Sequence, residues 1–331
     1  MKSHDFSVDC ELVTGEDEFK MMLTRAMSDR NGQFVGRIGG SDFDAVAHFL
    51  GYRLVKPTLE YPWLPYNPLA IWHINKTRNL NGLFSKNDRE LPEVFRGYLQ
   101  VLHDAYEATE VTLYGNQVVA NAIELGHHTS LGPYLQKICH GKTLIPYKFL
   151  EGVRPFMSSF RDWGEGRRIL VVSPFSESVQ FQWPRRQSLL NGERFPDGQI
   201  LTLTTPVTYN NKIDVKKNLL QAKTGNWLTE LERLKDEINE LKFDVALLSC
   251  GSYAMPLGVH IANNLGKNAV YLGGALNPIF NIAGARFETP FYEQIMRAQM
   301  KISPVEMQDL ASVDGGRGIP GEALAAYLPK H

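Results

Sequence analysis

Several features that quickly assign a chain to a class are missing from these 331 residues. There are only three cysteines, Cys10, Cys139 and Cys250, and they lie far apart in no metal-binding or redox spacing. The first residues lack the apolar core of a secretory signal. No apolar run approaches the roughly 18 residues that a membrane span needs. These absences predict a cytoplasmic protein with reduced thiols and no transmembrane segment.

The chain also has almost no net charge. It contains 35 Lys and Arg against 36 Asp and Glu, a formal charge of −1. Such a balance gives no long-range attraction to nucleic acid or to an anionic membrane. We therefore expect no nucleic-acid partner. With 43% hydrophobic and 21% charged residues, the composition is that of an ordinary globular protein.

Familiar catalytic and phosphate-binding motifs are absent as well. The sequence has no G-x-G-x-x-G, no G-x-x-x-x-G-K-[ST], no H-E-x-x-H and no G-x-S-x-G. The nine histidines are scattered. The chain therefore offers no signature of a P-loop enzyme, a zinc protease or a serine hydrolase.

What the sequence does contain is a repeated pattern of strand, turn and helix. Between Arg167 and Phe287 the pattern occurs four times, and short apolar runs predict strands at 168–173, 199–204, 244–249 and 269–272. Residues 33–38 begin a fifth such unit. Continuously apolar strands separated by helices are typical of a parallel sheet that is buried on both faces. We predict an α/β, Rossmann-like fold with a mostly parallel sheet and helices on both faces.

Composition and pattern also suggest how the chain is divided. We predict an N-terminal α/β part over residues 1–165, which carries the turn Arg37-Ile-Gly-Gly-Ser-Asp42. A Rossmann-like unit over 166–290 follows, and then a C-terminal helix and tail over 291–331.

The predicted fold indicates where a ligand binds. In an open parallel sheet, ligands occupy the crevice outside the carboxyl ends of the strands. Backbone N–H groups at a following helix start suit a phosphate. Each glycine-containing turn alone is more typical of chain reversal, so the stronger signal is that the turns share one sheet edge. The candidate turns are 37–42, 173–177, 204–208, 250–253 and 273–277.

Carboxylates near strand ends are candidates for chemistry. Asp42 and Asp44 form a D-x-D pattern, but residues two apart on a helix diverge, so both bind one metal only in an irregular turn. Asp42 alone, as helix cap or ligand, is the alternative. Glu177 is either a general base or a favourable charge at a helix start, worth about 0.3–1 kcal/mol. For Cys250 a small buried residue is favoured over a nucleophile.

Four stretches together resemble one family. Arg37-Ile-Gly-Gly-Ser-Asp42 is similar to an R-x-G-x-x-E/D segment, and residues 172–182 resemble HPF-x-x-[ST]-I-x-x-Q. Residues 244–257 resemble DVALIGCGAYGLPL, and residues 269–286 resemble AIHLGGATQ-x-LFGIKG-x-RW. These are segments of GT-D-type glycosyltransferases and related proteins of polysaccharide gene clusters. The matches cover most of residues 33–287.

The resemblance implies a Rossmann-like glycosyltransferase that binds a nucleotide-sugar donor and a divalent metal, Mn²⁺ or Mg²⁺, through a D-x-E motif. It implies a glycan or lipid-linked acceptor in polysaccharide biosynthesis. Here Gly40 stands at the position of the motif's Asp, and Asp42 at the position of its Glu. One carboxylate is missing, so the metal requirement is left open.

Residues and resemblance together predict the roles at the site. Asp42 is expected to hold a metal or act as base, and Glu177 is the other candidate base. Alternatives are a transferase with a different donor and a non-catalytic nucleotide- or sugar-binding partner. The residues expected to bind nucleotide or substrate are Arg37, Gly39, Gly40, Ser173, Pro174, Phe175, Gln180, Cys250, Gly251, Tyr253, Gly273, Gly274 and Asn277.

Overall fold

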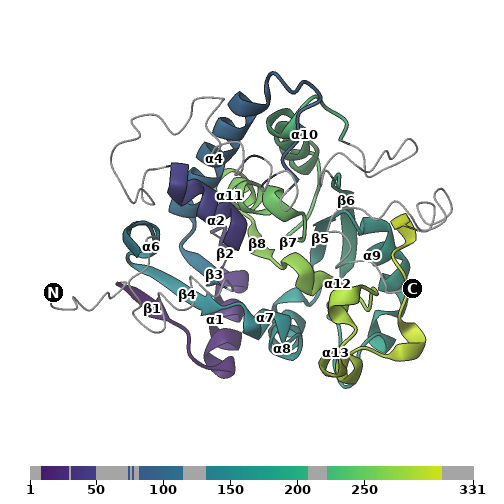
Figure 1. Ribbon diagram of the computed structural model, residues 1–331. Helices are drawn as coiled ribbons and strands as arrows, with labels where there is room; N and C mark the ends of the chain where they lie inside the picture. The colour runs from purple at the N-terminus through teal and green to yellow at the C-terminus, as the bar shows by residue number, and fades with distance from the viewer. Residues whose placement is uncertain are drawn as a thin grey trace.

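One eight-stranded sheet runs through the molecule, in the order β1-β4-β3-β2-β8-β7-β5-β6 (Figure 1). The computed structural model describes residues 9–29, 31–49, 74, 77, 82–114, 132–207 and 222–307. Every paired strand runs parallel to its neighbour. The strands are β1 (Cys10–Leu12), β2 (Phe34–Ile38), β3 (Val111–Tyr114), β4 (Lys142–Pro146), β5 (Arg168–Ser173), β6 (Gln199–Thr204), β7 (Val245–Leu248) and β8 (Asn268–Tyr271).

The α/β fold with a parallel sheet is confirmed. All four strands predicted in the second half of the chain are present and parallel. The strand predicted at 33–38 lies in the same sheet, because β2 pairs with β8 and Val35 lies opposite Val270. The two halves of the chain therefore meet at the β2–β8 junction. The edge strand β1 was not predicted, because three residues are too few to show a period.

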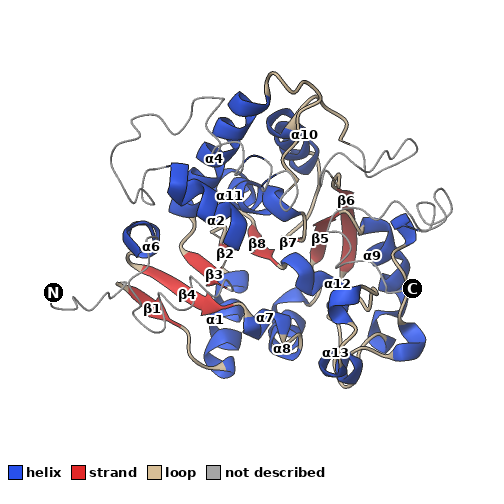
Figure 2. Cartoon of the chain, viewed as in Figure 1, coloured by secondary structure: helices blue, strands red, loops and turns tan. Residues whose placement is uncertain are grey.

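Helices cover both faces of the sheet (Figure 2). The strand side chains alternate: Leu170 and Val172 join one hydrophobic cluster, and Ile169 and Val171 join the other. We call the first side face A and the second face B. Face A is covered by α2 (Gly40–Phe49), α4 (Leu91–Ala108), α6 (Gly132–Cys139), α10 (Trp227–Asn239) and α11 (Ala254–Leu265). Face B is covered by α1 (Glu16–Ser28), α7 (Lys148–Glu151), α8 (Arg154–Gly164), α9 (Ser176–Gln182), α12 (Leu276–Ile279) and α13 (Pro290–Ile295).

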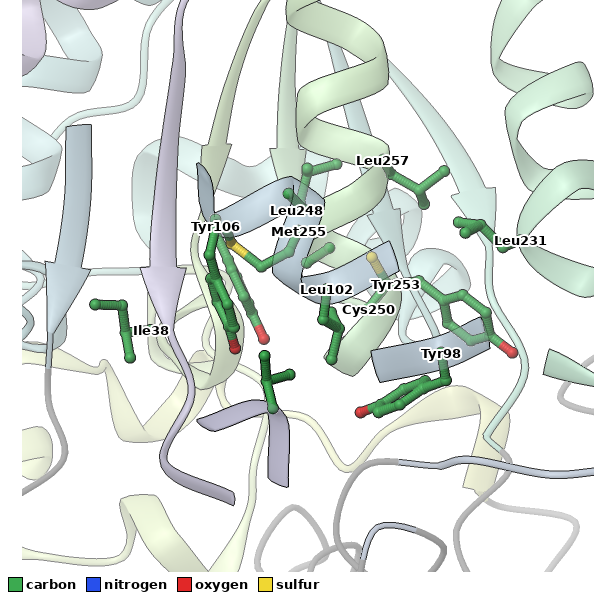
Figure 3. Packing of buried hydrophobic residues seen from close by; sticks show 14 of the residues in the cluster. Ile38, Tyr98, Leu102, Tyr106, Leu231, Leu248, Cys250, Tyr253, Met255 and Leu257 are labelled. Atoms are coloured by element: carbon green, nitrogen blue, oxygen red, sulfur yellow. The ribbon is translucent and has the colours of Figure 1, made fainter. Parts of the chain in front are cut away.

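Close packing on face A depends on a helix glycine. A Cβ on Gly258 of α11 would lie 2.1 Å from the ring of Phe34 on β2. The missing side chain therefore lets α11 approach the sheet at the β2–β8 junction. Figure 3 shows this layer, with Tyr106 of α4 beside Met255 and Tyr98 of α4 beside Tyr253.

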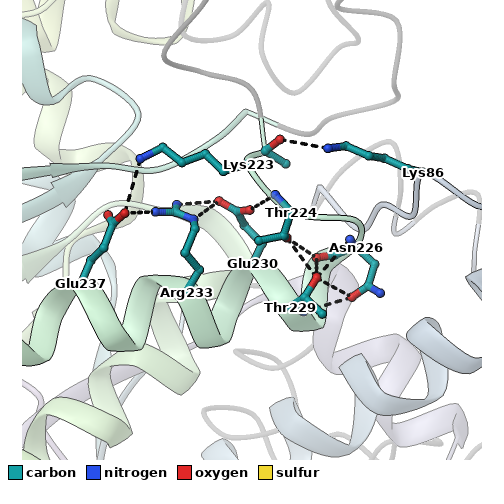
Figure 4. Close-up of polar contacts among 9 residues, drawn as sticks. Lys86, Lys223, Thr224, Asn226, Thr229, Glu230, Arg233 and Glu237 are labelled. Carbon is teal, nitrogen blue, oxygen red and sulfur yellow. Dashed lines mark hydrogen bonds and ion pairs between the residues drawn. The ribbon is translucent and has the colours of Figure 1, made fainter.

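Local capping explains where α10 begins. Asn226 accepts a hydrogen bond from the backbone N–H of Thr229 at 3.0 Å, and the hydroxyl of Thr229 accepts one from Asn226 N–H at 3.2 Å. The fully buried Glu230 accepts from the backbone N–H of Thr224 at 2.9 Å and also pairs with Arg233 (Figure 4). These bonds fix the start of a helix that the apolar spacing predicts over 227–241.

Two predicted helices are shorter than expected. The sequence between the predicted strands 168–173 and 199–204 predicts one helix over 179–190, but α9 gives way at Trp183 to a 3-10 turn over Trp183–Ser188. Pro184 explains the break, because proline supplies no N–H for the helical ladder. For the predicted C-terminal helix the sequence indicates residues 291–300, but α13 ends at Ile295, since Met296 is extended. The sequence also predicts helices over 118–125 and 322–328, which lie outside the described residues.

None of the described helices is long and apolar enough to cross a membrane.

Candidate functional site at the β2–β8 junction

The carboxyl ends of β2 and β8 lie side by side at the centre of the sheet. The chain leaves β2 through Gly39 into α2 on face A. It leaves β8 through Gly273 into α12 on face B. Connections that part to opposite faces open a crevice outside the strand ends, where ligands of such sheets bind.

Arg37 and Gly273, which lie far apart in the sequence, meet at this crevice. The guanidinium carbon of Arg37 lies 3.8 Å from the ring centroid of Tyr147 and 5.8 Å from that of Tyr271. A Cβ on Gly273 would lie 2.7 Å from Nη1 of Arg37 and 3.1 Å from the hydroxyl of Tyr147. Gly273 also has φ +54°, in the left-handed region that favours glycine. Glycine is therefore required here both for its conformation and for the approach of Arg37.

Side-chain hydroxyls hold the backbone carbonyls around the turns that follow β7 and β8. Tyr147 donates to the carbonyl of Leu272 at 2.7 Å, and Ser249 donates to that of Gly273 at 2.7 Å. Tyr271 donates to the carbonyl of Gly251, another glycine with positive φ, at 3.0 Å. The two glycine turns are thus fixed to each other. Sequence reasoning missed Tyr147, although its place directly after the apolar end of β4 was a usable signal.

Asp42 lies inside the first turn of α2 and not at its N-cap, so of the two roles expected for Asp42 alone, helix cap or ligand, the cap is wrong. The helix begins at Gly40, two residues before it. One oxygen of Asp42 accepts a hydrogen bond from the hydroxyl of Tyr98, and the other lies 3.2 Å from the point where a Cβ on Gly39 would be. The carboxylate therefore folds back over the turn that follows β2.

The environment of Tyr98 keeps it protonated. Burial first, and then the negative charge of Asp42, raise the pKa of Tyr98 well above its usual value. The same two causes raise the pKa of Tyr106. Tyr98 thus remains a hydroxyl that donates to Asp42 at any pH near neutrality.

The Mn²⁺ or Mg²⁺ that the resemblance implies stays a prediction. Among the described residues, no group of three or more His, Cys, Asp and Glu side chains is placed to hold a metal ion. Asp42 has one oxygen committed to Tyr98. The side chain of Asp44 lies outside the described residues.

The turn at 173–177 is arranged differently from what a phosphate cradle needs. Ser173 is fully buried, and its hydroxyl accepts from the N–H of Phe175 at 3.0 Å. The N–H of Ser178 donates to Glu306 at 2.8 Å, and its hydroxyl donates to the same carboxylate at 2.5 Å. Burial raises the pKa of Glu306. The start of α9 is therefore occupied by a side chain from the end of the described chain, which no local pattern predicts.

The remaining candidates near this turn lie away from the junction. Phe175 is buried, Pro174 is partly buried, and Gln180 is exposed and donates to Thr202. The buried glutamine of α9 is Gln182, which donates to the carbonyl of Met300 at 2.9 Å. Glu177 lies in the first turn of α9, after β5, which is three strand spacings, or about 14 Å, from β2. The structure thus does not bring Glu177 together with Asp42. The predicted turn at 204–208 is described only as far as Val207.

An aromatic column connects Asp42 to the turn after β7. Tyr98 packs edge-on against Trp227 with ring centroids 4.7 Å apart, and Trp227 stacks on Tyr253 at 5.0 Å. The indole N–H of Trp227 donates to Ser252 at 3.0 Å. Figure 3 shows Tyr98, Cys250 and Tyr253 in this region. Burial raises the pKa of the Cys250 thiol far above its usual value, which agrees with a buried residue and not with a nucleophile.

Gly274 and Asn277 complete the predicted set. Gly274 is buried in the short turn that leads into α12. Asn277, the second residue of α12, is fully buried. Both therefore belong to the connection that leaves β8 toward face B.

Comparison with known proteins finds one family model. Residues 204–279 match a GT-D fold-like domain, which confirms the predicted resemblance for that part of the chain. No curated protein matches the chain.

Two solved structures are similar in shape. One is of the highly conserved domain of unknown function 1792, reported to have a distinct glycosyltransferase fold; it is 13% identical, with a TM-score of 0.42. The other is a selenomethionine-substituted structure of domain of unknown function 1792, 12% identical, also with a TM-score of 0.42. Each alignment covers 81% of this chain and 79% of the other.

Proposed function

We propose that this protein is a glycosyltransferase that takes a sugar from a nucleotide-sugar and binds the donor's diphosphate at the β2–β8 junction. The observation that carries the proposal is the position of Arg37. Its guanidinium lies over Tyr147 and against the Gly273 turn, at the carboxyl edge of a parallel sheet. The match of residues 204–279 to a GT-D fold-like domain supports the same activity.

Arg37 suits a diphosphate for chemical reasons. A guanidinium binds phosphate oxygens through two parallel charge-assisted hydrogen bonds. A cation that is already oriented stabilises the charge that grows on the diphosphate as it leaves. Packing against Tyr147 holds the guanidinium in place before the donor arrives.

Asp42 is the proposed general base, for an acceptor that is a glycan or a lipid-linked sugar. The acceptor hydroxyl attacks the anomeric carbon, its proton passes to the carboxylate of Asp42, and the bond to the diphosphate breaks. The bonding electron pair leaves with the nucleoside diphosphate. Tyr98 donates to one carboxylate oxygen of Asp42 and so orients the other. Asp42 is preferred to Glu177 because it lies in the helix that follows β2, the strand that contains Arg37.

A donor panel tests the proposal. Tm would be measured with UDP-, GDP-, CDP- and dTDP-sugars, each with and without Mn²⁺, for the wild type and for Arg37→Gln. The expected result is a rise in Tm with one nucleotide class in the wild type and a much smaller rise in the variant. If no nucleotide-sugar raises Tm of the wild type, the proposal is overturned. A rise that depends on Mn²⁺ would show that the cation is part of the bound complex.

Turnover separates an enzyme from a binding protein. Release of nucleoside diphosphate from the donor that binds would be followed with glycan and lipid-linked acceptors. Transfer that requires Asp42 supports the assignment. Tight donor binding with no release by any acceptor, and no effect of Asp42→Asn on that binding, would favour a non-catalytic partner in polysaccharide biosynthesis.

A further inference from the structure

A chain of buried hydrogen bonds reaches Asp42 from the start of α10. The indole N–H of Trp227 donates to the hydroxyl of Ser252 at 3.0 Å. Ser252 is hydrogen-bonded in turn to the hydroxyl of Tyr98, which donates to Asp42. Tyr98 and Trp227 are 0% exposed and Ser252 is 4% exposed, whereas Asp42 is only partly buried. The chain therefore runs through the core on face A and ends at the most exposed of its four members.

The two ends of the chain fix the direction of every bond in it. An indole N–H can only donate, and an ionised carboxylate can only accept. Ser252 must therefore accept from Trp227 and donate to Tyr98, and Tyr98 must donate to Asp42. A hydroxyl hydrogen normally rotates to suit its surroundings, but each of these two has one bond to accept and one to donate. Tyr98 is thus held as a donor toward Asp42, and neighbouring bonds in the chain strengthen one another.

The first member of the chain is fixed by its neighbours. The backbone N–H of Trp227 donates to the carbonyl of Phe84 at 3.1 Å, and the residue before it caps α10 with its side chain. Its ring packs edge-on against Tyr98 and stacks on Tyr253, at centroid distances of 4.7 and 5.0 Å. The indole therefore cannot turn away from Ser252 without the loss of both ring contacts.

The second member lies in a turn that also contacts the donor side of the crevice. Ser252 belongs to the 3-10 turn after β7, and Tyr271 donates to the carbonyl of Gly251 in the same turn at 3.0 Å. The ring centroid of Tyr271 lies 5.8 Å from the guanidinium carbon of Arg37. Through one side chain in each direction, this turn is connected to the cation proposed for the diphosphate and to the proposed base.

We propose that Ser252 is a positioning residue: through Tyr98 it holds the carboxylate of Asp42 in the orientation that receives the proton of the acceptor. A general base works only when its free oxygen lies within hydrogen-bond reach of that proton. A displacement of about 1 Å at such a position costs about 10²-fold in rate. Ser252 acts through Tyr98 and not on the substrate itself. The inference rests on the proposed function and gives the turn after β7 a role in turnover.

Ser252→Ala tests the proposal by separating turnover from binding. Its kcat should fall about 10- to 100-fold, because the hydroxyl that holds Tyr98 toward Asp42 is lost. KM for the nucleotide-sugar, and its affinity in a calorimetric titration, should stay at the wild-type values, since Arg37 is untouched. A loss in kcat alone is the sign of an interaction that matters only in the transition state. Tyr98→Phe, which removes the bond to Asp42 itself, should lower kcat further.

A double-mutant cycle shows whether the effect passes through Asp42. In an Asp42→Asn background, Ser252→Ala should change the residual rate less than about twofold, because the group that it positions no longer accepts a proton. A general loosening of the fold would instead lower the rate of Asp42→Asn by the same factor as that of the wild type.

Trp163 and Ser159 provide the matched control on face B. The indole N–H of Trp163 donates to the hydroxyl of Ser159 at 3.0 Å, and that hydroxyl lies 2.9 Å from the hydroxyl of Thr24. Both members of this pair are buried, as Trp227 and Ser252 are. Ser159→Ala therefore removes the same kind of buried bond away from the crevice. It should lower Tm about as much as Ser252→Ala and leave kcat unchanged.

Two outcomes would overturn the inference while the proposed function stands. One is a Ser252→Ala variant with the kcat of the wild type, and the other is an equal loss in kcat with and without Asp42. If Ser252→Ala does not fold, Trp227→Phe takes its place, because it keeps a ring and loses the indole N–H, with Trp163→Phe as its control. If the wild type transfers sugar from no donor, the proposed function fails and the inference with it.

Discussion

The two edges of the sheet both carry charged and amide side chains, but they use them in opposite ways. At the amino edge a cleft of about 450 Å³ is lined by Arg167, Arg168, Asp244, Lys267 and Asn268 among others. Arg168 pairs with Asp244 at 2.6 Å, and Arg167 donates to the carbonyl of Met27 at 2.7 Å. Lys267 donates to the carbonyl of Leu241 at 3.4 Å. Each of these cations has a partner within the fold.

The helix ends explain this difference. In a parallel α/β sheet the C-termini of the helices gather at the amino edge, where cations stabilise the last carbonyls. Arg167 binds the last turn of α1 and Lys267 the chain just after α10. At the carboxyl edge the glycine turns leave room for Arg37, and the amide of Asn277 has no partner among the described residues. A concave, charged surface alone therefore does not identify a binding site.

The largest expected difference between the edges concerns turnover. Asp42→Asn removes the proposed base and keeps an acceptor for Tyr98, so kcat should fall about 10²- to 10⁴-fold with little change in Tm. Asp29→Asn at the amino edge is the control, because within the described part of the chain its side chain accepts from the N–H of Asn31, which asparagine also allows. Rates of nucleoside diphosphate release would be compared. An Asp42→Asn variant as active as the wild type removes Asp42 from the mechanism.

Donor affinity should distinguish two arginines. Arg37→Gln should weaken binding of the nucleotide-sugar about 10- to 150-fold, the effect of losing charge-assisted hydrogen bonds to a phosphate. Arg167→Gln should leave affinity unchanged and cost about 1 kcal/mol of stability, since it loses one bond to a helix carbonyl. Calorimetric titration and denaturant unfolding measure the two effects. Equal affinities in both variants would place the donor elsewhere.

Alanine at Gly32 and alanine at Gly273 should have opposite main effects. The first should mainly lower the stability of the fold, and the second should mainly lower donor affinity. Gly32 has φ +74°, and a Cβ there would lie 2.4 Å from the backbone carbonyl of Ala262. Gly32→Ala should therefore cost more than the about 1–2 kcal/mol of left-handed strain, without changing donor affinity directly. At Gly273 the added Cβ meets the end of a side chain, Nη1 of Arg37, and not backbone, so Gly273→Ala should lower stability less than Gly32→Ala and should lower donor affinity more, because it displaces Arg37. If Gly273→Ala proves the more destabilising and binds donor normally, the Arg37 contact has no role in binding.

The smallest effect is expected from acid titration at the amino edge. Hydrogen bonds from Arg168, together with its charge, lower the pKa of Asp244. Stability from this pair is present above the unfolded-state pKa of about 3.9 and is lost as pH falls through the lower folded-state pKa. Because both side chains are substantially exposed, the effect on Tm should be slight. The Tm difference between wild type and Asp244→Asn should shrink below pH 4, and a difference that stays constant to pH 2.5 would contradict this.

The sequence was a good guide wherever a local pattern carried the information. Apolar runs at 168–173, 244–249 and 269–272 predicted three parallel strands, because strands buried on both faces must be apolar throughout. The run at 199–204 also predicted a strand, although β6 lies at the edge of the sheet and contains Gln199, Thr202 and Thr204. The end of α9 was not predicted, because the apolar spacing in the sequence continues past Pro184, where the helix breaks. The position of Asp42 was also missed, because two glycines before a helix read as a turn whether or not the helix has already begun.

The sequence by itself determined the parallel sheet and the edge at which its glycine turns emerge, because both follow from residue spacing along one segment. The tertiary structure alone decided which distant residues meet there. It placed Arg37 against Gly273, brought Glu306 to the start of α9 in place of a phosphate, and left Asn277 without a hydrogen-bond partner among the described residues. Each of these depends on how β2 and β8, from opposite halves of the chain, pair in the sheet and on where the C-terminal segment packs. Such contacts have no local signature, because the free energy that selects them comes from burial summed over the whole core.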